Sequence, residues 1–253
     1  MKRIQGRVAV VTGAARGIGA AIADALAMQG ATVVRVDKVS LDGPHTFAID
    51  VADRSAVEAL PTLVANAVGP AAILVNNAGV SLGGRFAETS LEDLDWIMGV
   101  NFFGAVAMTK AFLPHLLASD EGHVVNVLSS FALIGWAGKS GYAASKFALR
   151  GFTESLYAEL CHTPVGVTAL YPGPVDTGLV RDGRADPRQR EAEAAFVSKR
   201  AIAAEKVGRA TVRAIRRKQL RVRLSRDYAL IDWITRAAPT LALKLLARLP
   251  VPF

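Results

Sequence analysis

Short apolar runs alternate with segments of helical periodicity along the first two thirds of the chain. Val8–Val11, Thr32–Val36 and Ile73–Val75 are short enough for buried strands and rich in β-branched residues. The segment after the first run repeats apolar residues at helical spacing and stops at Gly30. Strands that alternate with helices imply βαβ units, which build a parallel sheet covered by helices on both faces. We therefore predict an α/β protein, a single-domain, doubly wound parallel sheet.

The last third follows a different pattern. Leu220–Leu224 predicts a short basic strand, and Tyr228–Leu249 mixes apolar with basic residues around Pro239, which should divide it into two helices. Leu179–Ser198, rich in Arg, Asp, Glu and Ala, predicts a mobile helical lid. The predicted organisation is one domain over residues 1–253, with residues 178–200 as substrate lid and residues 226–253 as a helical C-terminal extension.

A glycine-rich turn separates the first strand from the first helix. Thr12–Gly19 has the spacing G-x-x-x-G-x-G, which lets the backbone approach a pyrophosphate at a helix N-terminus. Alone this is a weak signal, because glycine clusters also mark ordinary turns. The second strand ends in Asp37, eighteen residues after Gly19, where a carboxylate can accept hydrogen bonds from ribose hydroxyls. Together these residues predict a dinucleotide site.

Tyr142 and Lys146 lie four residues apart and share one face if they open a helix. A phenol titrates near pH ~10, and an adjacent ammonium lowers its pKa, so the tyrosine can act as general acid and base. Ser129, thirteen residues before Tyr142, could hold the reacting oxygen at the end of a neighbouring strand. Ser130 is the less favoured alternative, because it would point to the opposite face if the strand persists.

These motifs resemble the classical short-chain dehydrogenases/reductases from about Val8 to Thr177, and more loosely to the end of the chain. The resemblance implies a Rossmann-like fold and a nicotinamide dinucleotide. Asp50-Val51 resembles the pair at the adenine ring, Asn76–Gly79 matches the N-N-A-G motif, and Pro172–Thr177 resembles the P-G-x-V-x-T segment that meets the carboxamide. The cofactor-binding residues implied in this way are Gly13, Arg16, Gly17, Ile18, Gly19, Asp37, Asp50, Val51, Asn77, Ala78, Gly79, Tyr142, Lys146, Pro172, Gly173, Val175 and Thr177.

The same resemblance assigns a catalytic set of Asn101, Ser129, Tyr142 and Lys146. Ser129 and Tyr142 would hydrogen-bond the reacting oxygen, Tyr142 would transfer its proton, and Lys146 would lower the pKa of Tyr142 and bind the nicotinamide ribose. Asn101 would organise a water beside the lysine. Family members commonly assemble through the lysine-bearing helix and its neighbour, so we expect a homotetramer or homodimer.

The cofactor is predicted to be NAD, with NADP as the alternative. The carboxylate of Asp37 would repel a 2′-phosphate and suits free hydroxyls. Arg16 and Lys38 point the other way, because a cation there could meet that phosphate.

The substrate pocket should be bounded by the segments that follow three strands. They supply the apolar side chains Val80, Leu82, Phe131, Leu133, Ile134, Trp136, Pro174, Leu179 and Val180. Such a lining suits an apolar, lipid- or steroid-like ketone or secondary alcohol. Arg181, Arg184 and Arg188 could meet an anionic group, but we interpret them as surface residues first. Asp37 to Asp50 leaves little room for a helix, so a loop around Leu41–Pro44 is expected.

The apolar runs and the cysteine count bear on the cellular location of the protein and on possible disulfide or metal sites. No apolar run reaches the ~18 to 20 residues of a membrane span, and no apolar signal core precedes the first strand, so we expect a cytoplasmic protein. A lone cysteine, Cys161, excludes an internal disulfide and a cysteine-based zinc site, and we expect it to pack at the end of the Tyr142 helix. No metal site is predicted.

The net charge of +8 is concentrated near the end of the chain. Fourteen Lys/Arg against three Asp/Glu from Lys199 onward give +11, which leaves −3 for the rest. Without interleaved aromatics or a nucleic-acid motif, we interpret the basic strand as a solvated face and expect no nucleic-acid partner. Peripheral membrane contact through the tail is a less favoured alternative.

The sequence therefore predicts an NAD(P)-dependent oxidoreductase that interconverts a secondary alcohol and a ketone by direct hydride transfer. The alternative is a non-catalytic dinucleotide sensor, or a membrane- or partner-associated protein that uses the basic tail.

Overall fold

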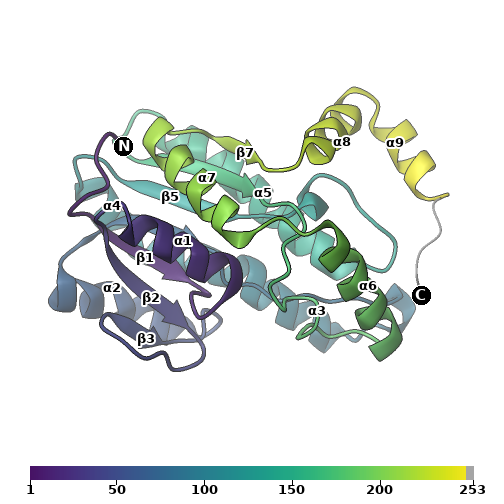
Figure 1. Ribbon diagram of the computed structural model, residues 1–253, viewed down its shortest axis with the longest axis horizontal. Helices are drawn as coiled ribbons and strands as arrows, with labels where there is room; N and C mark the ends of the chain where they lie inside the picture. The colour runs from purple at the N-terminus through teal and green to yellow at the C-terminus, as the bar shows by residue number, and fades with distance from the viewer. Residues whose placement is uncertain (249–253) are drawn as a thin grey trace.

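The computed structural model describes residues 1–248, and within them seven parallel strands form one sheet in the order β3-β2-β1-β4-β5-β6-β7 (Figure 1). Every neighbouring pair is parallel. The strands are β1 (Val8–Thr12), β2 (Thr32–Asp37), β3 (Thr46–Ala48), β4 (Ala71–Asn76), β5 (His123–Val127), β6 (Gly166–Tyr171) and β7 (Arg221–Arg223). The predicted doubly wound parallel sheet is confirmed.

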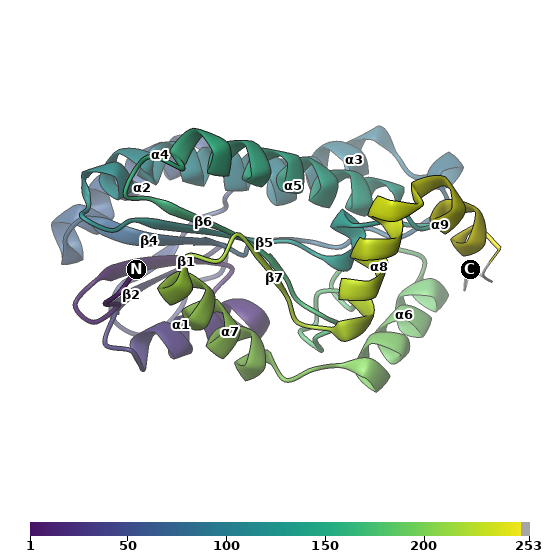
Figure 2. The same ribbon diagram turned by 90° about the horizontal axis from the view of Figure 1, so that it is seen from above.

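Helices cover both faces of the sheet (Figure 2). One layer contains α2 (Arg54–Val68), α4 (Ala105–Ala118) and α5 (Ser140–Leu160), whose apolar faces share a core with Val10, Val34, Leu74 and Val124. The opposite layer contains α1 (Gly17–Ala27) and α7 (Ala204–Arg217), which pack on the other face of the same strands. Alternate strand residues therefore enter two separate cores, because successive side chains of a strand point to opposite faces.

The strand order reverses between β1 and β4. The chain moves outward from β1 to β2 and β3, and then returns to place β4 on the other side of β1. In open α/β sheets a ligand binds at this switch point, beyond the carboxyl ends of the strands. Thr12 and Asn76 end the two strands that flank it.

One continuous helix, Leu91–Ala118, is long and apolar enough to cross a membrane by length and composition, with a mean hydropathy of 1.4. It comprises α3 (Leu91–Met98), a π-helical turn η2 (Gly99–Gly104) and α4. Met108, Phe112 and Leu116 of α4 are fully buried against the sheet. Our expectation that no apolar segment reaches this length is wrong by this criterion, and these side chains belong to the protein core.

The C-terminal extension contains the two predicted helices, α8 (Arg226–Ala237) and α9 (Pro239–Leu246), on either side of Ala238. Pro239 opens α9, since proline lacks the N–H that only the first turn can spare. Leu249 and the rest of the predicted extension to residue 253 lie outside the described residues.

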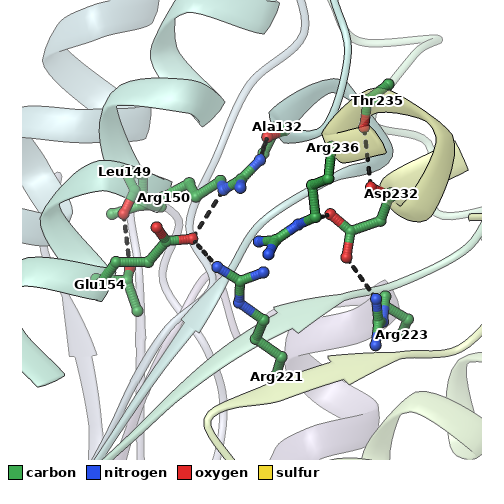
Figure 3. Close-up of polar contacts among 10 residues, drawn as sticks. Ala132, Leu149, Arg150, Glu154, Arg221, Arg223, Asp232, Thr235 and Arg236 are labelled. Carbon is green, nitrogen blue, oxygen red and sulfur yellow. Dashed lines mark hydrogen bonds and ion pairs between the residues drawn. The ribbon is translucent and has the colours of Figure 1, made fainter. Parts of the chain in front are cut away.

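The basic strand is solvated only in part, because Arg221 is half-buried and both arginines of the strand form ion pairs, while Arg223 is exposed (Figure 3). Arg221 pairs with Glu154 of α5 at 2.5 Å, and Glu154 also pairs with Arg150 at 2.8 Å. Arg223 pairs with Asp232 of α8, which is 2% exposed. The acids that compensate β7 lie far away in sequence, so the charge count of the tail could not show that these arginines attach α5 and α8 to the sheet edge.

Two further expectations have opposite outcomes. The chain runs from β2 to β3 without a helix, as predicted for Leu41–Pro44. The expected packing of Cys161 is wrong, because it is exposed at the C-terminal cap of α5.

Candidate active site

A cleft of about 1680 Å³ opens beyond the carboxyl ends of the strands. Its walls come from the turns after β1, β2, β4, β5 and β6, from the start of α5, and from α6 (Pro187–Arg200) with the segment before it. Most of the predicted cofactor residues line it. Gly17 and Gly19 do not line it, and neither does Asn101 of the predicted catalytic set.

The hydroxyl of Thr12 joins the two turns at the switch point. Its Oγ1 accepts hydrogen bonds from the backbone N–H groups of Asn77 and Ala78, both at 3.0 Å, and donates to Val75 O at 3.3 Å. The side-chain Nδ2 of Asn77 donates to the carbonyl oxygens of Thr12 and Gly13, at 2.9 and 3.1 Å. Hydrogen bonds therefore join the glycine turn directly to the Asn76–Gly79 segment, the second part of the predicted cofactor site.

Two glycines of the turn have no room for a side chain. Gly17 has φ +59°, and a Cβ there would lie 2.8 Å from Cβ of Thr177. A Cβ on Gly19 would lie 2.0 Å from the carbonyl oxygen of Gly13. No side chain caps the N-terminus of α1, and its first turn holds no acid. The turn thus offers backbone N–H groups and the positive end of a helix, which suit a pyrophosphate.

Asp37 and Arg16 both line the cleft but have different partners. Asp37 lines the cleft, and its carboxylate accepts a hydrogen bond from Ala15 N at 3.0 Å. Arg16 forms an ion pair with Asp182, in the segment that leads into α6. The cation that could have met a 2′-phosphate is thereby paired with a carboxylate of the segment before α6.

Tyr142 and Lys146 share one face of α5, as their spacing predicts. Both are buried, and both line the cleft. The Lys146 Nζ lies 6.0 Å from the centroid of the Tyr142 ring and donates a hydrogen bond to Val127 O at 3.1 Å. Burial lowers the pKa of Lys146 from 10.5 to about 8. A cation fixed beside a phenol favours the phenolate, which is what proton transfer by Tyr142 needs.

Asn101 reaches the site from the π-helical turn, where the backbone ladder is widened. Its Oδ1 accepts from Val80 N at 2.8 Å, and its Nδ2 donates to Val80 O and to the hydroxyl of Ser145, both at 3.0 Å. Ser145 in turn donates to the carbonyl oxygen of Tyr142 at 2.8 Å. Sequence reasoning missed Ser145, although its place inside the tyrosine–lysine motif was visible.

Ser129 and Ser130 both line the cleft after β5. Ser129 caps the short 3₁₀ turn η3 (Ser130–Ala132) by accepting a hydrogen bond from Phe131 N at 3.3 Å. The Phe131 ring packs edge-on against the Tyr142 ring, with centroids 5.7 Å apart. The assignment of the serine role to Ser129 stays a prediction.

The apolar end of the cleft agrees largely with the predicted lining. Leu82 and Leu133 are exceptions, because both belong to the buried core and neither lines the cleft. Arg181 pairs with Asp176 and Arg184 with Asp93, so these cations meet protein carboxylates. Lining residues that sequence reasoning missed come mainly from the lid and from segments that fold next to it: Ser81, Trp96, Lys139, Gln189, Glu193, Phe196, Val197, Arg200 and Ile231.

Comparison with known proteins identifies the family. Residues 7–188 match the family described as short chain dehydrogenase, and the chain belongs to this family. It is 35% identical over 255 residues to SadH of Mycobacterium tuberculosis, a protein named as an oxidoreductase. The alignment covers 93% of this chain and 92% of SadH.

Solved structures agree with this placement. A short-chain dehydrogenase/reductase from Burkholderia phymatum in complex with NAD is similar with a TM-score of 0.84 and 28% identity, over 95% of this chain and 96% of the other. A metagenomic short-chain oxidoreductase in complex with NADP is similar with a TM-score of 0.71 and 29% identity, over 87% and 97%. The chain is therefore a short-chain oxidoreductase of the class that uses NAD(P).

Proposed function

We propose that this protein interconverts a secondary alcohol and an apolar ketone with NAD as the preferred dinucleotide. The observation that carries the proposal is the buried Lys146 beside Tyr142, on the wall of a cleft that joins the glycine turn to an apolar lining. This arrangement combines a proton-transfer group, an anion-binding helix terminus and a desolvated substrate end.

Each member of the set has a separate task. Ser129 and Tyr142 hydrogen-bond the substrate oxygen, and Tyr142 takes the alcohol proton during oxidation or returns it during reduction. Lys146 keeps the phenol acidic and meets the ribose, while Asn101 holds the Val80 segment and the start of α5 in register. The bound nicotinamide supplies the hydride acceptor or donor. The protein supplies orientation and a largely apolar lining at the substrate end of the cleft.

Preference for NAD rests on two placements. Asp37 puts a carboxylate in the cleft beyond β2, where a 2′-phosphate would be repelled. Arg16 is paired with Asp182. Replacement of Asp37 by Ser should raise KM for NAD and lower KM for NADP, as measured by initial rates with each cofactor. Unchanged ratios of kcat/KM for the two cofactors would exclude this role for Asp37.

A homo-oligomer is part of the proposal. The helices α4 and α5, with the adjoining turn η2, leave Phe103, Leu117, Phe147 and Tyr157 at least 40% exposed on the outer surface. Light scattering at micromolar protein should give the mass of a dimer or tetramer. A monomeric mass would contradict this part of the proposal.

The decisive experiment follows absorbance of the reduced nicotinamide with a panel of apolar ketones and secondary alcohols. Tyr142→Phe keeps the ring and removes the hydroxyl, so turnover should fall about 10²- to 10⁴-fold while dinucleotide binding persists. Tyr157→Phe is the matched control, because Tyr157 lies on the same helix outside the cleft. Since Tyr157 belongs to the surface proposed for assembly, light scattering of this variant should first give the wild-type mass. Substantial turnover by Tyr142→Phe would refute the assignment.

A further inference from the structure

Lys139 places a buried cation at the substrate end of the cleft. It immediately precedes α5, three residues before Tyr142, lines the cleft, and is 6% exposed. The apolar residues around this end, among them Trp136 and Phe196, give no reason for a charge. An ammonium is costly to bury unless an anion accompanies it.

Polar groups of the Ser81–Gly83 segment surround this ammonium. Nζ of Lys139 lies 3.5 Å from the hydroxyl of Ser81 and 3.4 Å from Leu82 O. A Cβ on Gly83 would lie only 3.2 Å from the same Nζ. The Ser81–Gly83 segment is itself held by the lid root, since Gly83 N donates to Arg184 O at 2.9 Å and Arg184 N donates to Ser81 O at 3.0 Å. The ammonium of Lys139 is therefore held by a segment whose backbone is itself hydrogen-bonded to Arg184.

Its anion comes from the lid. The carboxylate of Glu193 lies 2.5 Å from the Lys139 Nζ. Glu193 belongs to α6, a helix in which no residue is buried, and its own side chain is 19% exposed. One partner of the pair lies in the buried wall of the cleft, and the other is carried by a helix without buried residues. Gln189, one turn earlier on α6, lines the cleft beside them.

We propose that Lys139 is the anchor for a carboxylate on the substrate, and that Glu193 occupies this anchor when no substrate is bound. The substrate class is then an apolar ketone or secondary alcohol that carries a carboxylate away from the reacting carbon. Its carboxylate replaces that of Glu193, while its apolar body meets the aromatic and aliphatic lining. This inference rests on the proposed alcohol–ketone activity and specifies its substrate.

The test compares keto carboxylates of increasing chain length with their primary amides, which match them in size and lack the charge. The wild-type protein should have a lower KM for the acid of the best-fitting length than for its amide. Lys139→Met should raise KM for the acid about ten- to hundredfold and leave the amide nearly unchanged, because only the acid loses a charge-assisted hydrogen bond. Glu193→Gln should lower KM for the acid about three- to tenfold, because it weakens the internal competitor.

Arg200→Met is the matched control. Arg200 also lines the cleft but is exposed, so its removal reports on general positive charge. Equal effects of Lys139→Met on acid and amide would overturn the proposal and leave the ion pair as a lid contact. Glu193→Gln keeps the test decisive if Lys139→Met does not fold, since an unchanged acid-to-amide ratio in that variant also overturns it.

A binding measurement separates this inference from the proposed reaction. Trp96 and Trp136 line the cleft, so their fluorescence should respond to a saturated fatty carboxylate more strongly than to its amide, and Lys139→Met should remove the difference. Selective binding without turnover would retain the anchor and count against the proposed reaction. Tyr142-dependent turnover without selectivity would retain the reaction and overturn the anchor.

Discussion

Replacement of Lys146 by Met measures how much the burial of this cation lowers the free energy of unfolding. Burial lowers the pKa of Lys146 from 10.5 to about 8, a difference of about 2.5, which at 1.36 kcal/mol per pH unit amounts to about 3 kcal/mol of destabilisation at pH 7. Met keeps the length of the side chain without its charge. Loss of the hydrogen bond to Val127 O costs about 1 kcal/mol. We expect the inactive variant to be more stable than the wild type by about 2 kcal/mol at pH 7.

The advantage of the variant should shrink as the pH rises. Between pH 8 and pH 10.5 the unfolded chain keeps the lysine proton while the folded protein has released it, so the unfolded state binds more protons. Wild-type stability therefore increases with pH in this window. Integration over the two pKa values predicts that about 2 kcal/mol of the gap closes between pH 7 and pH 9.5.

The assay is urea denaturation at both pH values without added dinucleotide, which would stabilise the folded state by binding to it. Lys110→Met is the control, because Lys110 is exposed on α4. Its stability relative to wild type should not change between the two pH values in this way. A Lys146→Met protein less stable than wild type at pH 7, by a margin that persists at pH 9.5, would refute the reasoning.

Three other predictions concern stability, the glycine turn and the C-terminal extension. Burial lowers the pKa of His123 from 6.5 to about 3, so between these pH values the unfolded state binds more protons and the protein loses stability as the pH is lowered. The wild type should lose about 2 kcal/mol of unfolding free energy by pH 5, and His123→Gln should lose less, as measured by urea denaturation. Gly17→Ala should abolish dinucleotide binding, as measured by calorimetry, because the added methyl group would meet Thr177. Gly43 also has a positive φ but no neighbour within 4 Å, so Gly43→Ala should only lower the stability by about 1 kcal/mol. Asp232→Ala should destabilise the protein by about 3 kcal/mol and expose α8 to proteolysis, because Arg223 and Arg236 lose their buried carboxylate partner. Unchanged proteolysis would show that apolar packing alone holds the helix.

The fold and the dinucleotide site could be predicted because their signals are local. The spacing from Thr12 to Gly19 describes one strand–turn–helix, and the four-residue step from Tyr142 to Lys146 describes one turn of one helix. Short-range backbone geometry determines such features, so their chemistry is visible before the chain is folded. The family match and the parallel sheet confirm the predicted family and fold.

The substrate end of the cleft depends on contacts between distant segments. Lys139 and Glu193 are fifty-four residues apart, and their pairing depends on α6 folding beside the residue that precedes α5. The pairing of Arg221 with Glu154 likewise turns a basic tail into a partly buried network. The sequence by itself determined the fold, the family and the glycine turn between β1 and α1, because each is specified by neighbours along the chain. Only the tertiary structure decided which charges face the substrate, because packing selects the few partners that end up within hydrogen-bonding distance.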